Sequence, residues 1–375
     1  MRKNLIKISA STFLLYGGLA VLVYFSLFLK NLGLNNAQIG LIVSLFSWTA
    51  LFARPVGGRI ADSLSVRTLL ILGAMIFAIS FFGLAIVGKN VPFIVGLRIA
   101  AGLGFAWYAL GSLLQSVEGE ELGKFTSNVS TLSVFYLLPY FIYPYIAIRI
   151  ARGMGFSAMF LFGGISVILS IPIILSIKSL RRQKKIKERE PRRKFGSGIF
   201  LLGIMNFFMG WSVNIAFPFF PLLEKIRPSI DTGLFFTVVS FMAVIIRAYI
   251  GRKLPFWGQP DVLFPGFLAY SLGFVVAYFA KTTLVFLIAG VFTGIGVGTV
   301  YPNITAMTLR LAEEDYRGVT MGFVSSLGDF GFCTGPIIFG YLSYKIGLLP
   351  SFLLWAVVIG IVPFMFILQL RKRVK

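Results

Sequence analysis

The chain has 375 residues, of which 57% are hydrophobic and only 13% are charged, whereas soluble domains carry about 25% charged residues. A net charge of +22 would suit a nucleic-acid-binding protein only if the basic residues covered one water-exposed surface, but most of them lie between long apolar segments. One cysteine and no histidine leave few metal ligands and no imidazole acid or base. Composition therefore predicts a protein of the lipid bilayer without metal or cofactor, and it argues against a nucleic-acid partner and against an enzyme.

The first apolar segment follows a basic start, as the apolar part of a signal peptide does. It continues without a charge from Ile8 to Leu29, which is long enough to span a bilayer core of roughly 30 Å. No small-residue cleavage site ends it. We therefore expect this segment to remain in place as the first transmembrane helix.

Segments of this kind recur along the whole chain. Twelve uncharged or nearly uncharged segments of about 20 residues predict twelve transmembrane helices in an all-α membrane protein. The eighth has the shortest uncharged run, because Arg247 stands near its end, where we expect the side chain to extend to the lipid headgroups. The segments are residues 8–29, 37–58, 68–88, 91–115, 125–148, 156–177, 197–222, 232–251, 262–280, 284–308, 319–343 and 349–370.

The loops between these segments differ strongly in charge. An even number of spans places both termini on one side, and about three quarters of the 35 Lys and Arg residues lie on that side. Basic residues are enriched in cytoplasmic loops. We therefore expect a multi-pass protein of the cytoplasmic membrane with both termini in the cytoplasm.

One long polar segment separates the sixth span from the seventh. It reads KSLRRQKKIKEREPRRK, from Lys178 to Lys194, and is strongly basic. Such a segment is typical of a solvated linker and is compatible with contact to anionic lipid headgroups. We therefore predict a six-helix bundle at 1–177, a basic cytoplasmic linker at 178–196 and a second six-helix bundle at 197–375.

The two halves repeat each other at the level of charge and glycine positions. One shift of the numbering by 193 residues aligns such positions at two separate loops, which hydrophobic composition alone does not explain. Duplicated bundles with a site between them are usual in secondary transporters. The aligned pairs are Arg54 with Arg247, Gly58 with Gly251, Arg59 with Arg252, Glu120 with Glu313, Glu121 with Glu314 and Lys124 with Arg317.

The turn GRIADSLSVR, between the second and third spans, carries a family signature. Gly58 is followed four residues later by Asp62, and Arg67 ends the segment. This resembles the loop signature between the second and third helices of the major facilitator superfamily, although three positions depart from its usual basic, glycine and basic residues: Ser63, Ser65 and Val66. The resemblance implies twelve transmembrane helices in two pseudo-symmetric six-helix bundles that move a small-molecule substrate by alternating access.

The same turn is the candidate cytoplasmic gate. Its glycine allows close backbone approach, and its carboxylate can sit against the positive N-terminus of a helix from the other half. By resemblance, that helix is the eleventh span near Gly318. The alternative is that these residues only hold a tight turn and carry positive charge. The gate residues are Gly58, Arg59, Asp62 and Arg67.

Arg98 lies inside the fourth span, where it precedes spaced small residues in RIAAGLGFAW. The small residues allow close helix packing. Arg98 itself lies about nine residues, or roughly 13 Å of helix rise, from Lys89. Its side chain can therefore face an internal cavity and hold negative charge, or it can extend to the outer headgroups.

Asp329 lies well inside the eleventh span, roughly 18 Å from Arg317 along the helix. A carboxylate at that depth must be protonated, paired or exposed to water, and membrane carboxyl groups often carry protons in transport cycles. We expect Asp329 to couple or gate transport; the alternative is a protonated Asp that bonds a neighbouring helix. The same span contains GPIIFG, residues 335–340, a signal for a kink and for close packing.

The remaining candidate site residues come from the first, fourth, seventh and tenth spans, which line the cavity in the family. Polar and aromatic groups in apolar spans need partners, so helix packing is the alternative explanation for each of them. The candidates are Tyr16, Tyr24, Trp107, Tyr108, Asn206, Trp211, Asn214, Tyr301 and Asn303.

Together these features predict a secondary transporter of a small solute, with protons as the candidate coupling ion, acting as a monomer in the bilayer. A uniporter and a proton-driven efflux antiporter for drugs or metabolites are alternatives. The fifth span lacks the glycine–proline pattern that family antiporters carry there, which counts against a drug antiporter. A transporter-like sensor or anchor that transports nothing is a third alternative, and it would not need water-accessible charges at Arg98 and Asp329.

Overall fold

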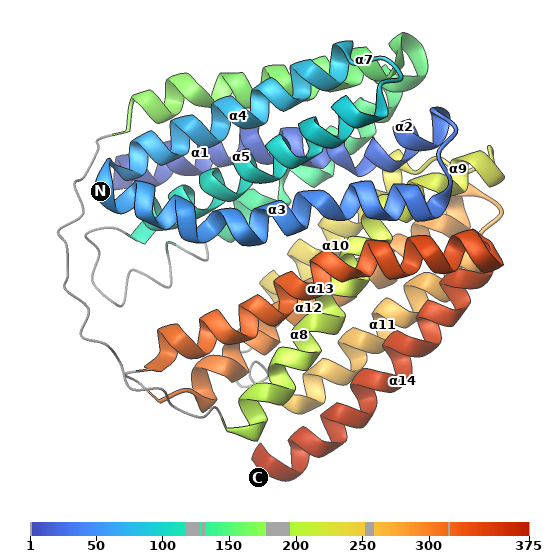
Figure 1. Cartoon of the computed structure of the whole chain (residues 1–375). Coiled ribbons are helices and arrows are strands. Elements are labelled where there is room, and N and C mark those ends of the chain that lie inside the picture. The colour runs from blue at the N-terminus through green and yellow to red at the C-terminus, as the bar shows by residue number, and fades with distance from the viewer. Residues whose placement is uncertain are drawn as a thin grey trace. The chain divides into compact units, whose positions relative to one another are not determined.

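The computed structural model describes residues 2–117, 128, 132–177, 196–251, 259–313 and 316–374, and these residues are almost entirely helical (Figure 1). A few side chains within these ranges, including that of Asp62, are outside the description. Two 3-10 turns, Leu22–Tyr24 and Phe220–Leu222, join α1 to α2 and α8 to α9. The helices are α1 (Arg2–Val21), α2 (Phe25–Asn31), α3 (Asn36–Ser63), α4 (Val66–Ile86), α5 (Val91–Val117), α7 (Pro139–Leu175), α8 (Ser197–Phe219), α9 (Leu223–Ile226), α10 (Gly233–Gly251), α11 (Pro260–Phe279), α12 (Thr283–Leu311), α13 (Arg317–Ile346) and α14 (Leu348–Val374).

The described residues contain the twelve expected membrane spans. Ten helices are long and apolar enough to cross a bilayer. The longest, Leu132–Leu175, contains two spans, because Gly155 interrupts the helix with φ 88°, a conformation that glycine adopts without strain. The shorter apolar helix Gly233–Ala248 is the eighth span.

Arg247 of that eighth span has a partner on a neighbouring helix. Its Nη2 donates a hydrogen bond to the carbonyl oxygen of Val297 on α12, at 3.4 Å, and the residue is half-buried. A guanidinium in an apolar helix bundle needs an acceptor, and the neighbouring helix backbone supplies one. The expected reach of this side chain to the lipid headgroups stays a prediction.

The helices pair in the same pattern in both halves of the chain. In the first half α1 packs on α7, and α4 packs on α5 and on α7. In the second half α8 packs on α13, and α11 packs on α12 and on α14. Counted by span, each pair of the second half repeats a pair of the first half six spans later. The chain therefore forms two pseudo-symmetric bundles of six helices.

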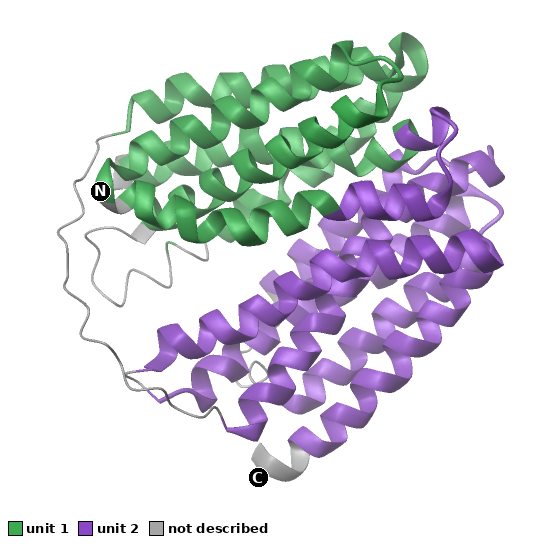
Figure 2. Cartoon of the chain, viewed as in Figure 1, with its two compact units in different colours: residues 1–28, 45–190 green, residues 29–44, 191–375 purple. Residues whose placement is uncertain are grey.

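The chain divides into two compact units, residues 1–28 with 45–190 and residues 29–44 with 191–375 (Figure 2). The start of α3 thus belongs with the second unit. The predicted basic linker lies almost entirely outside the described residues, so the boundaries at 177 and 197 stay a prediction.

Close backbone packing explains why the start of α3 belongs with the second unit. A Cβ added at Gly40 would overlap the carbonyl oxygen of Pro336 on α13 and would lie 3.0 Å from the Cα of Gly340. Asn36 adds a hydrogen bond from Nδ2 to the carbonyl oxygen of Ser343, at 3.5 Å. Small residues at a helix crossing allow this approach inside a membrane, where packing replaces the hydrophobic effect.

Cationic side chains cap the C-terminal end of α7. The last carbonyl groups of a helix have no partner within the helix, and they form the negative end of its dipole. Arg67 donates from Nη2 to the carbonyl oxygens of Leu175, at 2.7 Å, and Ile177, and Lys7 donates from Nζ to that of Ser176, at 2.7 Å. The first unit therefore ends its longest helix with charge-assisted hydrogen bonds.

A similar cap ends α11 in the second unit. Arg227 donates from Nη1 to the carbonyl oxygens of Tyr278, at 2.8 Å, and Ala280. Both units thus use an arginine from a loop or helix start to satisfy the end of a neighbouring helix.

Replacing Gly40 with alanine should force α3 away from α13, because the added Cβ would meet backbone atoms that cannot turn aside. We expect a clearly lower unfolding temperature for purified Gly40→Ala in a thermal scan. Gly322→Ala is the control, because no described atom lies within 4 Å of its Cβ position on α13 and alanine favours a helix. Equal unfolding temperatures for the two variants would contradict the importance of this contact.

Replacing Arg67 with glutamine should leave the last carbonyls of α7 without their cationic donor. Hydrogen bonds from charged groups contribute about 1.5–3 kcal/mol, so even partial solvent compensation should lower the unfolding temperature by about 2–5 °C. Arg59→Gln, which removes an exposed arginine of the same turn, is the matched control. The capping role fails if both variants unfold at the wild-type temperature.

Candidate functional site

Arg98 of α5 is enclosed by aromatic side chains of the first unit. The residue is only 6% exposed, and its guanidinium carbon lies 4.6 Å from the ring centroid of Phe25 and 4.7 Å from that of Phe46. Cation–π contacts contribute about 0.5–2 kcal/mol, depending on how far the charge is removed from water. The two rings therefore hold a positive charge inside the first unit, where it can attract an anion.

Tyrosines from three helical segments gather in the same unit. Tyr16 of α1 stacks on Tyr136 with ring centroids 4.5 Å apart, and Tyr140 and Arg54 are close enough to Tyr16 to interact electrostatically. The Tyr108 hydroxyl of α5 is hydrogen-bonded to Ser11, at 2.8 Å, and Thr12, at 3.2 Å. Tyr16 and Tyr108 were sequence candidates and lie in one cluster. That cluster presents aromatic faces and hydroxyl groups.

Tyr136 and Tyr140 belong to this cluster and were missed in the sequence. They lie on the fifth span, which was not among the spans expected to line a cavity. Their spacing of four residues puts them on one helix face, and this was the available signal. The Tyr136 hydroxyl also lies 3.4 Å from that of Ser112, which joins the fifth span to α5.

Trp107 and Tyr24 have surroundings of their own. Trp107 donates from Nε1 to the carbonyl oxygen of Ala53, at 3.1 Å, and packs against a cluster of small residues on α3 and α5. Tyr24 is fully buried in the 3-10 turn between α1 and α2. Trp107 thus connects α3 to α5. This contact fits the alternative explanation, in which Trp107 serves helix packing.

In the second unit, Asp329 is half-buried near the middle of α13. Three candidate residues of α8 bond that same helix on both sides of Asp329. Asn206 donates to the carbonyl oxygen of Val324 at 2.9 Å, Trp211 donates to the Thr334 hydroxyl at 2.7 Å, and Asn214 donates to the carbonyl oxygen of Phe332. These side chains therefore fix the part of α13 that carries the carboxylate.

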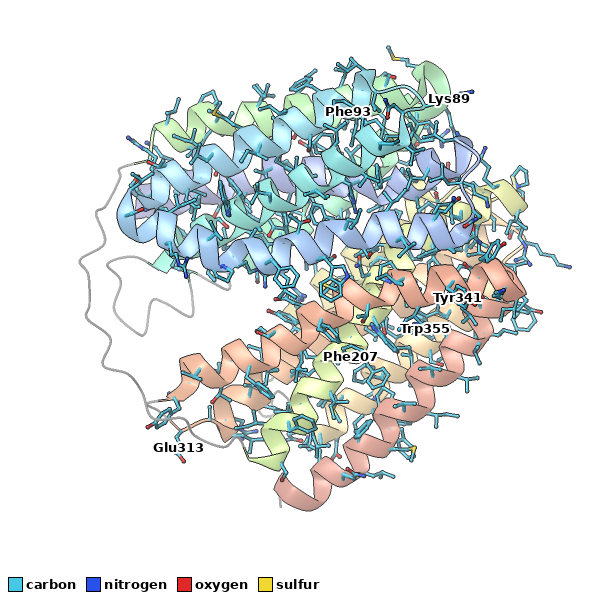
Figure 3. All side chains as sticks on the ribbon, viewed as in Figure 1. Lys89, Phe93, Phe207, Glu313, Tyr341 and Trp355 are labelled. Carbon is cyan, nitrogen blue, oxygen red and sulfur yellow. The ribbon has the colours of Figure 1, made fainter. Side chains whose placement is uncertain are left out.

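Aromatic rings surround Trp211 beside this segment. Its ring centroid lies 4.6 Å from that of Phe207 and 4.8 Å from that of Trp355, two residues labelled in Figure 3. Phe207 also stacks on Phe330, which follows Asp329 in the chain. Phe330 is 44% exposed, so this group of aromatic rings extends to the surface of the described chain. Phe207, Phe330 and Trp355 were not predicted as site residues, because nothing in the local sequence distinguishes them from packing residues.

The candidates on α12 separate into two roles. Asn303 is fully buried and exchanges two hydrogen bonds with the backbone of Gln259, through its Nδ2 at 2.8 Å and its Oδ1 at 3.3 Å. Gln259 is the N-cap residue of α11, so Asn303 holds the start of that helix. Tyr301, by contrast, is 46% exposed and can contact a ligand from the surface.

The residues of the candidate gate are only partly described. Arg59 is exposed, Arg67 caps α7, and no described atom lies within 4 Å of a Cβ built at Gly58 or Gly318. The side chain of Asp62 lies outside the described residues. The expected contact between Asp62 and the start of α13 therefore stays a prediction.

Comparison with known proteins agrees with this architecture. The family model "Major Facilitator Superfamily" matches residues 8–254 and 199–375. The chain is 21% identical over 348 residues to a "Multi-drug resistance efflux pump PmrA homolog" of Lactococcus lactis subsp. lactis (strain IL1403), covering 87% of this chain and 85% of that protein. It is 21% identical over 366 residues to the "Staphylopine export protein" of Staphylococcus aureus (strain Mu50 / ATCC 700699), covering 90% and 89%.

The fold matches solved transporters along their whole length. The crystal structure of a mutant of the nucleoside transporter NupG superimposes with a TM-score of 0.81 at 14% sequence identity, covering 98% of this chain and 99% of that one. Twelve apolar spans, two repeated bundles and a family match along the chain lead to one conclusion. The protein belongs to the major facilitator superfamily and is a multi-pass membrane transporter, not an enzyme.

Proposed function

We propose that this transporter exports a small organic solute from the cytoplasm in exchange for protons, and that Asp329 carries the proton. The observation that carries the proposal is the half-buried carboxyl group of Asp329 near the middle of α13, a helix that side chains of α8 bond on both sides of this residue. Export is supported by the two relatives, whose names describe an efflux pump and an export protein.

A carboxyl group at this position can couple two movements because protonation cancels its charge. The charged form favours water or a cationic partner, and the neutral form tolerates an apolar environment. In the proposed cycle, a proton from outside binds the Asp329 carboxylate, and release of that proton to the cytoplasm restores the carboxylate. Solute leaves when the site faces outward, so one movement depends on the other.

Arg98 is the proposed recognition group for negative charge on the solute. Its guanidinium lies over the rings of Phe25 and Phe46, and its hydrogen-bond donors lie along the edge of the planar group. An arginine at this depth attracts a carboxylate or phosphate more strongly than it would in water. We therefore propose a solute that carries at least one negative charge.

The proposed setting is the cytoplasmic membrane, with both termini in the cytoplasm and one chain as the working unit. The charge of the loops supports this orientation. Glu313 of the expected cytoplasmic loop and Tyr341 lie at opposite ends of the second unit (Figure 3). We further propose that Asp62 closes the cytoplasmic side against the start of α13 in one state of the cycle.

Replacing Asp329 with asparagine should abolish transport driven by a pH gradient, because the amide keeps the shape but cannot bind and release the proton. Exchange of labelled for unlabelled solute should continue in the same proteoliposomes. Asp261→Asn is the matched control, since Asp261 is an exposed carboxylate in the first turn of α11. Transport by Asp329→Asn with full dependence on the pH gradient would rule out the coupling role.

Replacing Arg98 with methionine should keep an unbranched stem between Phe25 and Phe46 while removing the charge. We expect uptake of a fluorescent organic anion into inverted vesicles, which reports export activity, to fall about tenfold or more, which corresponds to about 1.4 kcal/mol of lost binding. Arg149→Met is the control, because Arg149 also lies over a ring, that of Tyr145 at 5.1 Å, but is exposed. Unchanged anion export by Arg98→Met would contradict the recognition role.

A further inference from the structure

Pro336 leaves one carbonyl group of α13 without its usual partner. In an α-helix each carbonyl oxygen accepts from the N–H four residues later, and proline has no N–H. Pro336 lies inside α13, so the carbonyl of Phe332 loses its helical donor. Phe332 lies three residues after Asp329, close to one turn of helix away.

Asn214 of α8 supplies the missing donor. Its Nδ2 donates a hydrogen bond to the carbonyl oxygen of Phe332. Within a membrane a freed carbonyl must be satisfied by protein or by ordered water. The amide of Asn214 therefore replaces the backbone N–H donor that α13 lacks at Pro336.

The backbones of α8 and α13 are also in close contact along the rest of their crossing. A Cβ built at Gly331 would overlap the carbonyl oxygen of Phe207, and one built at Gly210 would overlap that of Gly328. Gly328 and Gly331 share the face of α13 that meets α8, and Asp329 lies about 100° around the helix from Gly328. The backbone on either side of Asp329 thus rests directly on α8.

We propose that Asn214 is a positioning residue for Asp329, and that it acts by satisfying the carbonyl that Pro336 leaves free. This inference rests on the proposed function of Asp329. The turn of α13 that precedes Pro336 is bonded by a side chain from α8, so the direction in which the carboxyl group is presented depends in part on that amide. Without this amide, the carbonyl of Phe332 lacks a hydrogen-bond donor, and the turn between Asp329 and Pro336 is free to shift.

Asn206 offers an unusually close control within the same pair of helices. It also donates from Nδ2 to a carbonyl of α13, that of Val324, at 2.9 Å. Residue 328, four residues after Val324, is a glycine with its own N–H, so this carbonyl keeps a helical donor. Removing Asn206 therefore takes away a second hydrogen bond, whereas removing Asn214 takes away the donor that replaces the missing N–H.

The test is a cycle of Asn214→Ala, Pro336→Ala and the double variant. Alanine at 336 restores the N–H, so the double variant should not need Asn214. We expect Asn214→Ala to lower pH-gradient-driven transport about tenfold and to shift its pH dependence. The double variant should return to within about twofold of Pro336→Ala, and Asn206→Ala should show a smaller loss that Pro336→Ala does not rescue.

A second measurement does not depend on transport. Cys333, the single cysteine of the chain, is buried beside Phe332 and reports on this turn without any engineered label site. In detergent-solubilised full-length protein, a small maleimide should label Cys333 several-fold faster in Asn214→Ala than in wild type, and at the wild-type rate in the double variant. Asn206→Ala should label slowly.

The outcomes separate this inference from the proposed function. If Asp329→Asn abolishes coupling while Asn214→Ala keeps wild-type transport and labelling, the positioning role is wrong and the proposed function stands. A double variant that is as impaired as Asn214→Ala would also overturn the inference, because Asn214 would then act without reference to Pro336. If Asp329→Asn transports normally, the proposed function fails, whereas rescued labelling of Cys333 would still support the Asn214–Pro336 link.

Discussion

Every polar backbone group inside a bilayer needs a partner within the protein, and this constraint explains the placement of polar side chains in the structure. Arg67 and Lys7 satisfy the end of α7, Arg227 satisfies the end of α11, and Asn214 satisfies a carbonyl freed by proline. Two of these side chains, those of Arg67 and Asn214, were candidate site residues in the sequence. In the structure, their first contacts are with backbone, so they define where the helices bend and end.

Once the backbone is satisfied, the few charges inside the spans need a different explanation. Arg98 is held between two aromatic rings in the first unit, and Asp329 lies half-buried in the second. Burying either charge is costly, and neither position is required by helix geometry. A transport cycle gives both a purpose: one attracts negative charge on a solute, and the other exchanges a proton. Aromatic rings lie against the Arg98 guanidinium, and amide groups of α8 bond the helix that carries Asp329.

The fold could be predicted from the sequence because its signals are local. Each span is a run of about 20 apolar residues that can be recognised without its packing partners. The twelve spans are confirmed, with Gly155 dividing the longest helix into two of them. Roles could not be predicted as well, because they depend on partners far apart in the chain. Asn214 and Phe332 are 118 residues apart, and Arg67 and Leu175 are 108 apart. The bond from Arg247 to the carbonyl oxygen of Val297 was not predicted, because hydropathy does not show which carbonyl lies nearby.

The most direct test of the central claim is to measure proton and solute flux together in proteoliposomes that contain the purified protein. A pH-sensitive dye inside the vesicles reports proton movement when a solute gradient is imposed without a pH gradient. If a carboxyl group in α13 couples the two, solute flux should drive protons in the opposite direction, in a fixed ratio. Solute flux with no accompanying change of internal pH would contradict the claim.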